Sequence, residues 1–120
     1  TSTKNTNSIM RKITEEMCSC LMHLYPKLRS NTQVRIEGFQ MGSPTIASMY
    51  LFGNKIATYH SPTNILEISN CGWFSNTTLE RLNGLPGVLI HRRKGIWHLN
   101  GEIWDGSLKK IKLERNESIN

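Results

Sequence analysis

The sequence has 120 residues, of which 38% are hydrophobic and 20% are charged, and its formal net charge is +6. A chain of this length is expected to form a single domain, because two halves would each be too small to bury a stable core. The composition excludes an intrinsically disordered chain, and the sequence contains no run of about 18 apolar residues that would predict a transmembrane helix.

The charge balance favours an acidic partner. Lys and Arg number 15 against nine Asp and Glu, which is typical of proteins that contact nucleic acid or an acidic protein surface. The same charge serves only for solubility in many small proteins. The three cysteines have spacings that match no disulfide framework or zinc motif, so they indicate reduced thiols and a cytoplasmic protein.

The first predicted element is an amphipathic helix that starts at Ile9. Apolar residues recur every three or four positions from Ile13 to Leu28, and polar residues fill the positions between them. Pro26 is expected to end or bend this helix, because proline lacks an amide hydrogen and disfavours helical geometry in the residue before it. Residues 1–8 are polar, unlike a secretory signal, and are predicted as a lead-in that contains the helix cap.

An antiparallel β meander is predicted to follow the helix. Its first strand alternates apolar and polar residues, and a loop is expected over 38–44. Gly53-Asn54 is predicted to form a two-residue hairpin turn, because both residues tolerate positive φ. A further turn is expected over 61–64. The predicted strands of this meander are 33–39, 46–52, 55–60 and 65–68.

A short helix and a second meander are predicted next. Thr77 and Glu80 have the spacing of a capping box, and Gly84 followed by Pro86 is typical of a helix end. Beyond this helix, short apolar segments alternate with glycine-containing turns, as in a β ribbon. The predicted strands of the second meander are 88–91, 96–99, 102–104 and 107–113.

These elements predict an α+β fold. Its order is an N-terminal amphipathic helix, an antiparallel β meander, a short helix and a second antiparallel β meander, with the helices packed on one face of the sheet. A single domain is expected over residues 9–113, between the polar lead-in of 1–8 and a polar C-terminal tail of 114–120.

No catalytic or metal-binding pattern is present in the sequence. It contains no Gly-X-Ser-X-Gly segment and no glycine-rich phosphate loop, and its carboxylates are scattered and not paired. His91 and His98, together with Cys71 or His60, lack the short spacings of zinc ligands and are interpreted as strand or turn residues. We therefore expect a protein that is not an enzyme and that holds no cofactor or metal.

The strongest candidate for a binding site is a basic loop. Three consecutive basic residues, Arg92 to Lys94, lie at a predicted turn, and lysines of the last predicted strand are expected beside them. Two tryptophans on the strands between are interpreted either as stacking platforms for unpaired bases or as core anchors, which is the commoner role in small domains. The candidate residues for binding nucleic acid or another partner are Arg92, Arg93, Lys94, Trp97, Trp104, Lys109, Lys110 and Lys112.

A recognisable pattern covers a little over half of the chain. It consists of the segments Tyr50-Leu-Phe-Gly-Asn-Lys-Ile-Ala57, Gly72-Trp-Phe-Ser-Asn-Thr-Thr-Leu-Glu-Arg-Leu-Asn83, Leu85-Pro-Gly-Val88, Trp97-His-Leu-Asn-Gly101 and Trp104-Asp-Gly106. The pattern resembles a group of small uncharacterised proteins encoded by bacteriophages. The resemblance implies a phage or mobile-element origin, and it brings no established activity, cofactor or catalytic residues.

The resemblance also raises the expectation of a binding role, because small phage accessory proteins are often nucleic-acid binders or inhibitors of a host enzyme or defence complex. We therefore expect a small, non-enzymatic binding protein in the cytoplasm of a bacterial host cell, which contacts nucleic acid through its basic loop and strand. The alternatives are an inhibitor that binds a host or defence protein and a structural component of the virion. The oligomeric state is open.

Overall fold

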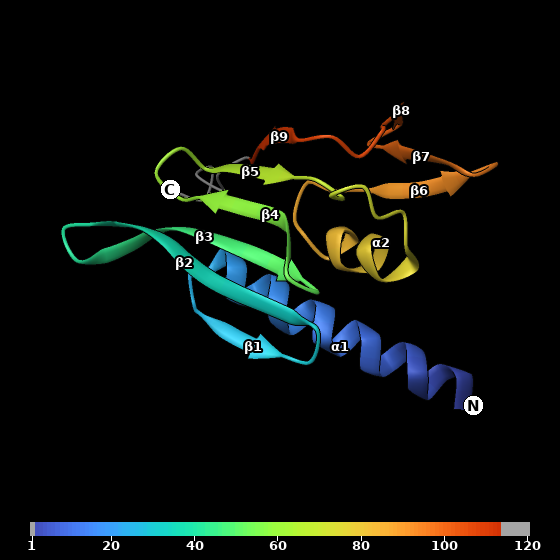
Figure 1. The fold of residues 1–120 in the computed structure, drawn as a ribbon, viewed down its shortest axis with the longest axis horizontal. Helices are drawn as coiled ribbons and strands as arrows, with labels where there is room; N and C mark the ends of the chain where they lie inside the picture. Colours follow the sequence, from blue (N-terminus) through green and yellow to red (C-terminus); the bar gives the residue numbers. More distant parts are fainter. Residues whose placement is uncertain (1, 114–120) are drawn as a thin grey trace, which may run out of the picture.

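The computed structural model describes residues 2–113, with the side chains of 11–113, and it confirms the expected α+β fold (Figure 1). A six-stranded antiparallel sheet forms the body of the molecule, and a separate three-stranded sheet lies beyond one end of it. The predicted tail of 114–120 lies outside the described residues. The elements are α1 (Ser2–Met22), β1 (Lys27–Arg29), β2 (Thr32–Gln40), β3 (Ser43–Leu51), β4 (Asn54–His60), β5 (Ile65–Ile68), α2 (Asn76–Asn83), β6 (Ile90–Arg93), β7 (Ile96–Leu99), β8 (Glu102–Ile103) and β9 (Lys109–Lys112).

Helix α1 begins seven residues before the predicted start at Ile9, so the polar segment expected as a lead-in is part of the helix. The helix ends before Pro26, as the sequence predicts. Leu24 adopts a φ of 57°, and the Tyr25 amide donates a hydrogen bond of 2.8 Å to the Cys20 carbonyl, which closes the last turn. Met17 and Leu21, on the apolar stripe, are fully buried against the large sheet.

The strands of the large sheet are ordered β1-β2-β3-β4-β5-β9. Two of its turns differ from the prediction. The loop expected over 38–44 is a two-residue turn at Met41-Gly42, because both residues adopt positive φ and a bulge at Gly38 adjusts the register. The next turn is Phe52-Gly53 and not Gly53-Asn54, since Leu51 pairs with Asn54.

The two faces of the large sheet differ in character. One face carries an apolar row that runs across neighbouring strands and is buried together with residues of α1; its members are Val34, Met49, Ala57 and Ile68. The opposite face carries a polar row in the adjacent register positions, made of Arg35, Ser48, Thr58, Glu67 and Lys110. We call this second surface the polar face.

Helix α2 is on the same side of the large sheet as α1. Its cap differs from the predicted capping box of Thr77 and Glu80: the Ser75 hydroxyl accepts a hydrogen bond of 3.2 Å from the Thr78 amide, so the helix begins two residues earlier than Thr78. The Arg81 guanidinium is buried and donates to the Thr32 hydroxyl at 3.0 Å and to the Thr14 hydroxyl at 2.7 Å. These bonds fix α2 to β2 and α1.

The small sheet consists of β6, β7 and β8, and the last predicted strand does not belong to it. Residues 109–112 form β9, which pairs with β5 at the edge of the large sheet. The chain turns back at Gly106, whose φ is 89° and whose carbonyl accepts a 3.0 Å bond from the Asn70 amide and a 3.2 Å bond from the Ser69 hydroxyl. This contact directs the chain to the edge of β5.

Candidate functional site

The predicted basic loop is the turn between β6 and β7, and its three basic side chains point in different directions. Arg92 is the cross-strand partner of Trp97, whereas Arg93 is paired with Ile96 and therefore lies on the opposite face of the small sheet. Lys94 lies in the turn itself, with a φ of 53°. The Arg92 guanidinium donates a hydrogen bond to the side-chain carbonyl of Asn76, the first residue of α2.

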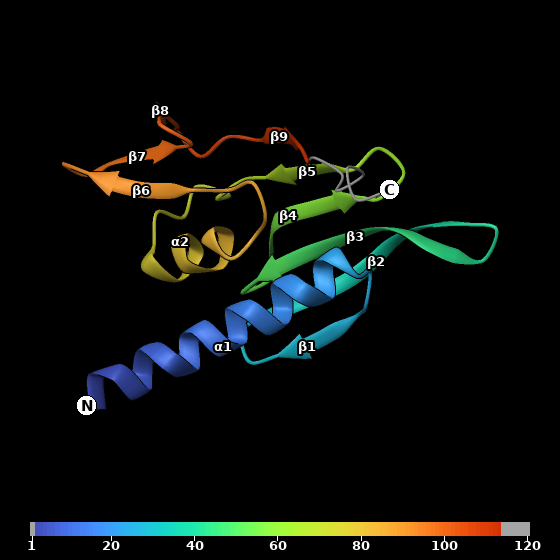
Figure 2. The same ribbon diagram turned by 180° about the vertical axis from the view of Figure 1, so that it is seen from behind.

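The lysines of β9 are not next to this turn. Lys109, Lys110 and Lys112 are exposed on an edge strand of the large sheet, where Lys110 lies opposite Glu67. Both views of the ribbon place the β6–β7 turn at the far end of the small sheet from β9 (Figures 1 and 2). The basic stripe expected from the sequence is therefore divided into two separate groups.

The two tryptophans expected near the basic loop are core residues. Trp97 is 2% exposed and Trp104 is 7% exposed, with their ring centroids 6.2 Å apart. Phe74 packs edge-on against Trp97, and the Trp104 indole donates a 2.9 Å hydrogen bond to the Ser107 carbonyl. Of the two interpretations of these residues, the structure supports the core anchor, because burial leaves neither ring a free face for a base.

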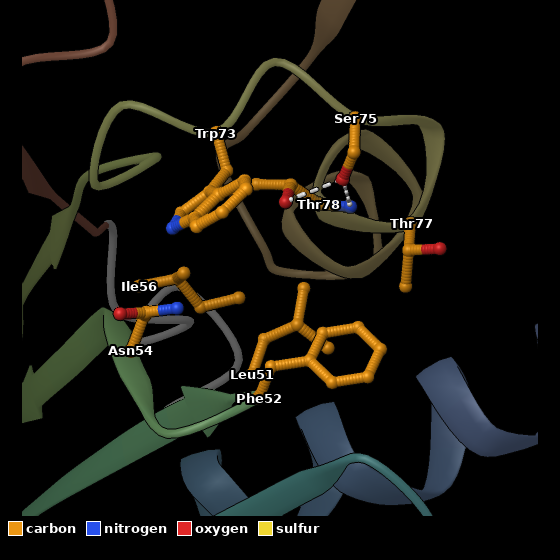
Figure 3. Close-up of a pocket in the computed structure, with 8 residues that line it drawn as sticks. All are labelled: Leu51, Phe52, Asn54, Ile56, Trp73, Ser75, Thr77 and Thr78. Carbon is orange, nitrogen blue, oxygen red and sulfur yellow. Dashed lines mark hydrogen bonds between the residues drawn. The ribbon is translucent and has the colours of Figure 1, made fainter.

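A different pair of aromatic residues is exposed, at a pocket of about 380 Å³ between the β3–β4 turn and the start of α2 (Figure 3). Phe52 is 70% exposed and Trp73 is 58% exposed, and the two rings lie on opposite sides of this pocket. We call it the aromatic pocket. Its lining residues are Leu51, Phe52, Asn54, Ile56, Trp73, Ser75, Thr77 and Thr78.

The backbone holds both rings out of the core. Phe52 occupies the first position of a tight turn at a φ of 51°, a conformation that costs a bulky residue about 1–2 kcal/mol. Its amide donates a 2.8 Å hydrogen bond to the Asn31 carbonyl. Trp73 follows the turn of Cys71 and Gly72, and its amide donates a 2.8 Å bond to the Asn70 carbonyl. Both rings are therefore presented by anchored loops.

Some polar side chains of the aromatic pocket form hydrogen bonds within the protein, and others do not. The Ser75 hydroxyl caps α2 and lies 2.9 Å from the Thr78 hydroxyl, so these two groups satisfy each other. Within the described part of the chain, the side chains of Asn54 and Thr77 form no hydrogen bond. The pocket thus combines two exposed rings, an apolar floor and a free amide, which is the chemistry expected of a ligand site.

The aromatic pocket lies next to the β6–β7 hairpin, whose segment Arg92 to Lys94 we call the basic turn. Ser75 and Thr77 line the pocket, and Asn76, which lies between them in the sequence, receives the hydrogen bond from Arg92. Arg92 is therefore the basic residue beside the pocket, whereas Arg93 lies on the other face of the hairpin and Lys94 lies in the turn that follows. Sequence reasoning missed Phe52 and Trp73. The available signals were a large apolar residue before the turn glycine Gly53 and a tryptophan in a loop after Gly72.

The comparison with known families adds the origin of the chain. Residues 10–116 match the model of a family described as Kyanoviridae Gp96 protein. The chain belongs to this family. The Gp96 match confirms the expected resemblance to small phage proteins, and it also covers most of α1, which lay outside that resemblance. No curated protein and no solved structure matches the chain.

The polar face of this Gp96-family protein carries an ionic network that the sequence did not reveal. The Glu37 carboxylate accepts hydrogen bonds from the Ser48 hydroxyl at 2.7 Å, from the Lys55 ammonium at 3.0 Å and from the Tyr50 hydroxyl. Partial burial would raise the pKa of Glu37, but the bonds from Tyr50, Ser48 and Lys55 outweigh it and lower the pKa to about 2. Glu37 is therefore ionised near neutral pH and is poorly suited to general acid catalysis.

Among the residues that the structure describes, one histidine of the Gp96-family protein lies within ion-pair distance of a carboxylate. His60 Nε2 lies 3.4 Å from a Glu67 carboxylate oxygen beside a hollow of about 440 Å³ on the polar face. His91 and His98 stack with centroids 5.9 Å apart on the small sheet. Within residues 2–113, no group of three or more His, Cys, Asp or Glu side chains could hold one metal ion. Neither described helix is both long and apolar enough to cross a membrane.

Proposed function

We propose that this phage protein binds single-stranded nucleic acid. An unpaired base stacks between Phe52 and Trp73, and the adjoining phosphates contact Arg92 and Lys94 of the β6–β7 hairpin. The observation that carries the proposal is the hydrogen bond from Arg92 to Asn76, because it places the basic turn next to the aromatic pocket. The net charge of +6 supports an anionic ligand.

The exposed rings favour a single strand over a duplex. Stacking of a base on an aromatic side chain contributes about 1–3 kcal/mol and tolerates any sequence, because every base has a π-face. Bases in a duplex are already stacked on one another, so a base must be flipped out before it can enter a pocket, at a cost of a few kcal/mol. An unpaired base avoids this cost.

Intrinsic fluorescence tests the proposal. The chain has three tryptophans, and Trp97 and Trp104 are buried, so stacking of a base on Trp73 should dominate any quenching on binding. We expect an oligothymidine of about nine nucleotides, within the range of single-strand site sizes, to quench the emission at low salt. Phe52→Ala should weaken binding about 5- to 150-fold, as expected for the loss of about 1–3 kcal/mol of stacking.

Phe39→Ala is the matched control. Phe39 is 65% exposed in β2, next to the β2–β3 turn, and does not line the aromatic pocket. This variant should bind the oligonucleotide with unchanged affinity. Trp73→Ala should weaken binding as much as Phe52→Ala does, and the anisotropy of a labelled oligonucleotide measures its affinity because this variant lacks the reporting tryptophan. Equal losses in Phe39→Ala and Phe52→Ala, or the absence of any binding at low salt, would contradict the proposal.

The same experiment separates nucleic acid from a protein partner. An apolar side chain of a host or defence protein also fits between two aromatic rings, and such rings are frequent hot spots of protein interfaces. That reading predicts no oligonucleotide binding and a stoichiometric protein recovered from nuclease-treated host lysate. Phe52→Ala should then fail to recover that partner protein from the lysate. This outcome would replace the proposed function with that of an inhibitor.

A further inference from the structure

We infer that Arg81 is a positioning residue of the aromatic pocket, because its buried guanidinium connects the two walls of the pocket from within the core. The inference rests on the proposed function and names a residue that shapes the same site. One wall consists of Leu51 and Phe52 at the β3–β4 turn, and the other includes Thr78 of α2 (Figure 3). Arg81 follows Thr78 by three residues, so both side chains lie on the same side of the helix.

The guanidinium reaches the first wall through the residues at the start of β2. Arg81 Nε donates a 3.0 Å hydrogen bond to the Thr32 hydroxyl, and Arg81 Nη2 donates a 3.4 Å bond to the side-chain oxygen of Asn31. Thr32 is the cross-strand partner of Leu51, and the Asn31 carbonyl accepts the 2.8 Å bond from the Phe52 amide. Arg81 therefore holds α2 to the two residues that support the β3–β4 turn.

The surroundings of Arg81 favour a role in geometry over a role in stability. The residue is 1% exposed, and within the described residues its guanidinium bonds to hydroxyl and amide oxygens and to no carboxylate. Burial of a charge without a partner of opposite sign costs free energy, and hydrogen bonds to neutral groups offset only part of this cost. An apolar side chain of similar volume would avoid the cost but could not bond to Asn31.

Arg81→Met tests the inference, because it keeps the approximate volume of the side chain and removes the guanidinium. We expect this variant to fold, since the Thr32 hydroxyl still donates its 2.7 Å bond to Asn31 and the Thr14 hydroxyl, released from Arg81, can bond to a carbonyl of its own helix. Urea unfolding checks that the variant is folded.

The readout is the ratio of two affinities. One is for an oligothymidine of about nine nucleotides, and the other is for an abasic strand of the same length, which keeps the phosphates but has no base to stack. We expect Arg81→Met to lower this ratio about five-fold or more, the lower end of what the loss of a stacked base predicts.

Arg35→Met is the matched control, because it removes the same charge from another part of the molecule. The Arg35 guanidinium lies on the polar face, 5.4 Å from the centroid of the Tyr50 ring, and does not line the aromatic pocket. This variant should keep the native ratio. Equal falls in Arg35→Met and Arg81→Met would overturn the inference.

Substitutions of Asn31 separate the position of the wall from the loss of a buried charge. The side-chain oxygen of Asn31 accepts bonds from Arg81 and Thr32, and its amide nitrogen donates none within the described residues. Asn31→Asp keeps the acceptor and should retain the native ratio, whereas Asn31→Ala removes it and should lower the ratio as Arg81→Met does. This pair decides the inference if Arg81→Met does not fold.

Hydrogen exchange of the Phe52 amide gives a second readout that needs no nucleic acid. The bond from this amide to the Asn31 carbonyl should open more often in Arg81→Met and Asn31→Ala than in the native protein. We therefore expect the Phe52 amide to exchange faster in both variants, measured relative to the amide of Met49 in the middle of β3.

The outcomes separate this inference from the proposed function. Native affinity ratios and native exchange of the Phe52 amide in Arg81→Met and Asn31→Ala overturn the role of Arg81. A native protein that binds the oligothymidine and the abasic strand equally overturns the stacking in the proposed function. The exchange of the Phe52 amide then decides by itself whether Arg81 positions the wall of the pocket.

Discussion

The individual residues of the aromatic pocket are positioned by backbone conformation. Phe52 adopts a φ of 51° where asparagine or glycine would be more favourable, and its ring remains 70% exposed. Burial of a ring normally stabilises a small domain, and here the turn prevents it. Phe52 therefore contributes little to the core, whereas Trp97 and Trp104 carry the stabilising burial.

Glu37 gives a residue-scale prediction for stability. Its pKa of about 2 in the folded protein lies below the ordinary value of about 4.3 expected for the unfolded chain, so the unfolded state binds more protons between these values. The contribution of Glu37 is present above about pH 5 and is lost as the pH falls toward about 2. We expect the free energy of unfolding in urea to fall less steeply over this range in Glu37→Gln than in the native protein.

Glu102→Gln is the control for this measurement. Glu102 is an exposed carboxylate of β8 that forms no ion pair within residues 2–113. Its substitution should leave the acid dependence of stability unchanged. If the free energy of unfolding of Glu37→Gln falls with acid as steeply as that of the native protein, the hydrogen bonds on the polar face do not lower the pKa of Glu37.

At the scale of elements, the start of α2 connects folding to the pocket. Ser75 caps the helix and also lines the pocket, so Ser75→Ala is expected to lower the free energy of unfolding by about 1 kcal/mol. Thr77→Ala is the matched comparison, because Thr77 is the capping residue that sequence spacing favours and it has no capping bond in the described structure. Its effect should stay within about 0.5 kcal/mol. Urea unfolding of both variants measures the difference, and a larger effect at Thr77 would restore the predicted capping box.

Local patterns predicted the types of most elements but not their partners. Alternation predicted β2, a glycine-containing turn predicted the hairpin of β3 and β4, and helical periodicity predicted α1, because these signals depend on neighbouring residues. The pairing of β9 with β5 is accompanied by a hydrogen bond between the backbones of Asn70 and Gly106, and no local pattern predicts a contact between residues so far apart in the sequence. The same limit applies to the site. Trp73, Trp97 and Trp104 are chemically alike, and only the tertiary fold leaves Trp73 exposed.

At the scale of the whole molecule, the basic residues that the sequence singled out form two groups, Arg92 to Lys94 and the lysines of β9, and only the first adjoins the pocket. The affinity for single strands should fall with salt at a log–log slope of about −0.7 per neutralised phosphate. Replacing Arg92 and Lys94 with glutamine should reduce this slope by about one phosphate contact each. Lys109→Gln, in β9, should leave the slope unchanged, because β9 lies away from the basic turn. Equal changes in both variants would instead indicate one interface that spans both groups.

The position of β9 also bears on how the molecule holds together. The chain leaves the large sheet after β5, builds α2 and the small sheet, and returns to complete the large sheet at its edge. Ile65–Ile68 can gain its last partner only after the intervening segment has folded back, with Asn70 bonded to Gly106. Loop closure of this kind links distant segments into one cooperative unit. A chain that ends before β9 would leave β5 as an open edge able to pair with other molecules. The lysine-bearing β9 replaces this edge with a charged one, which disfavours such pairing.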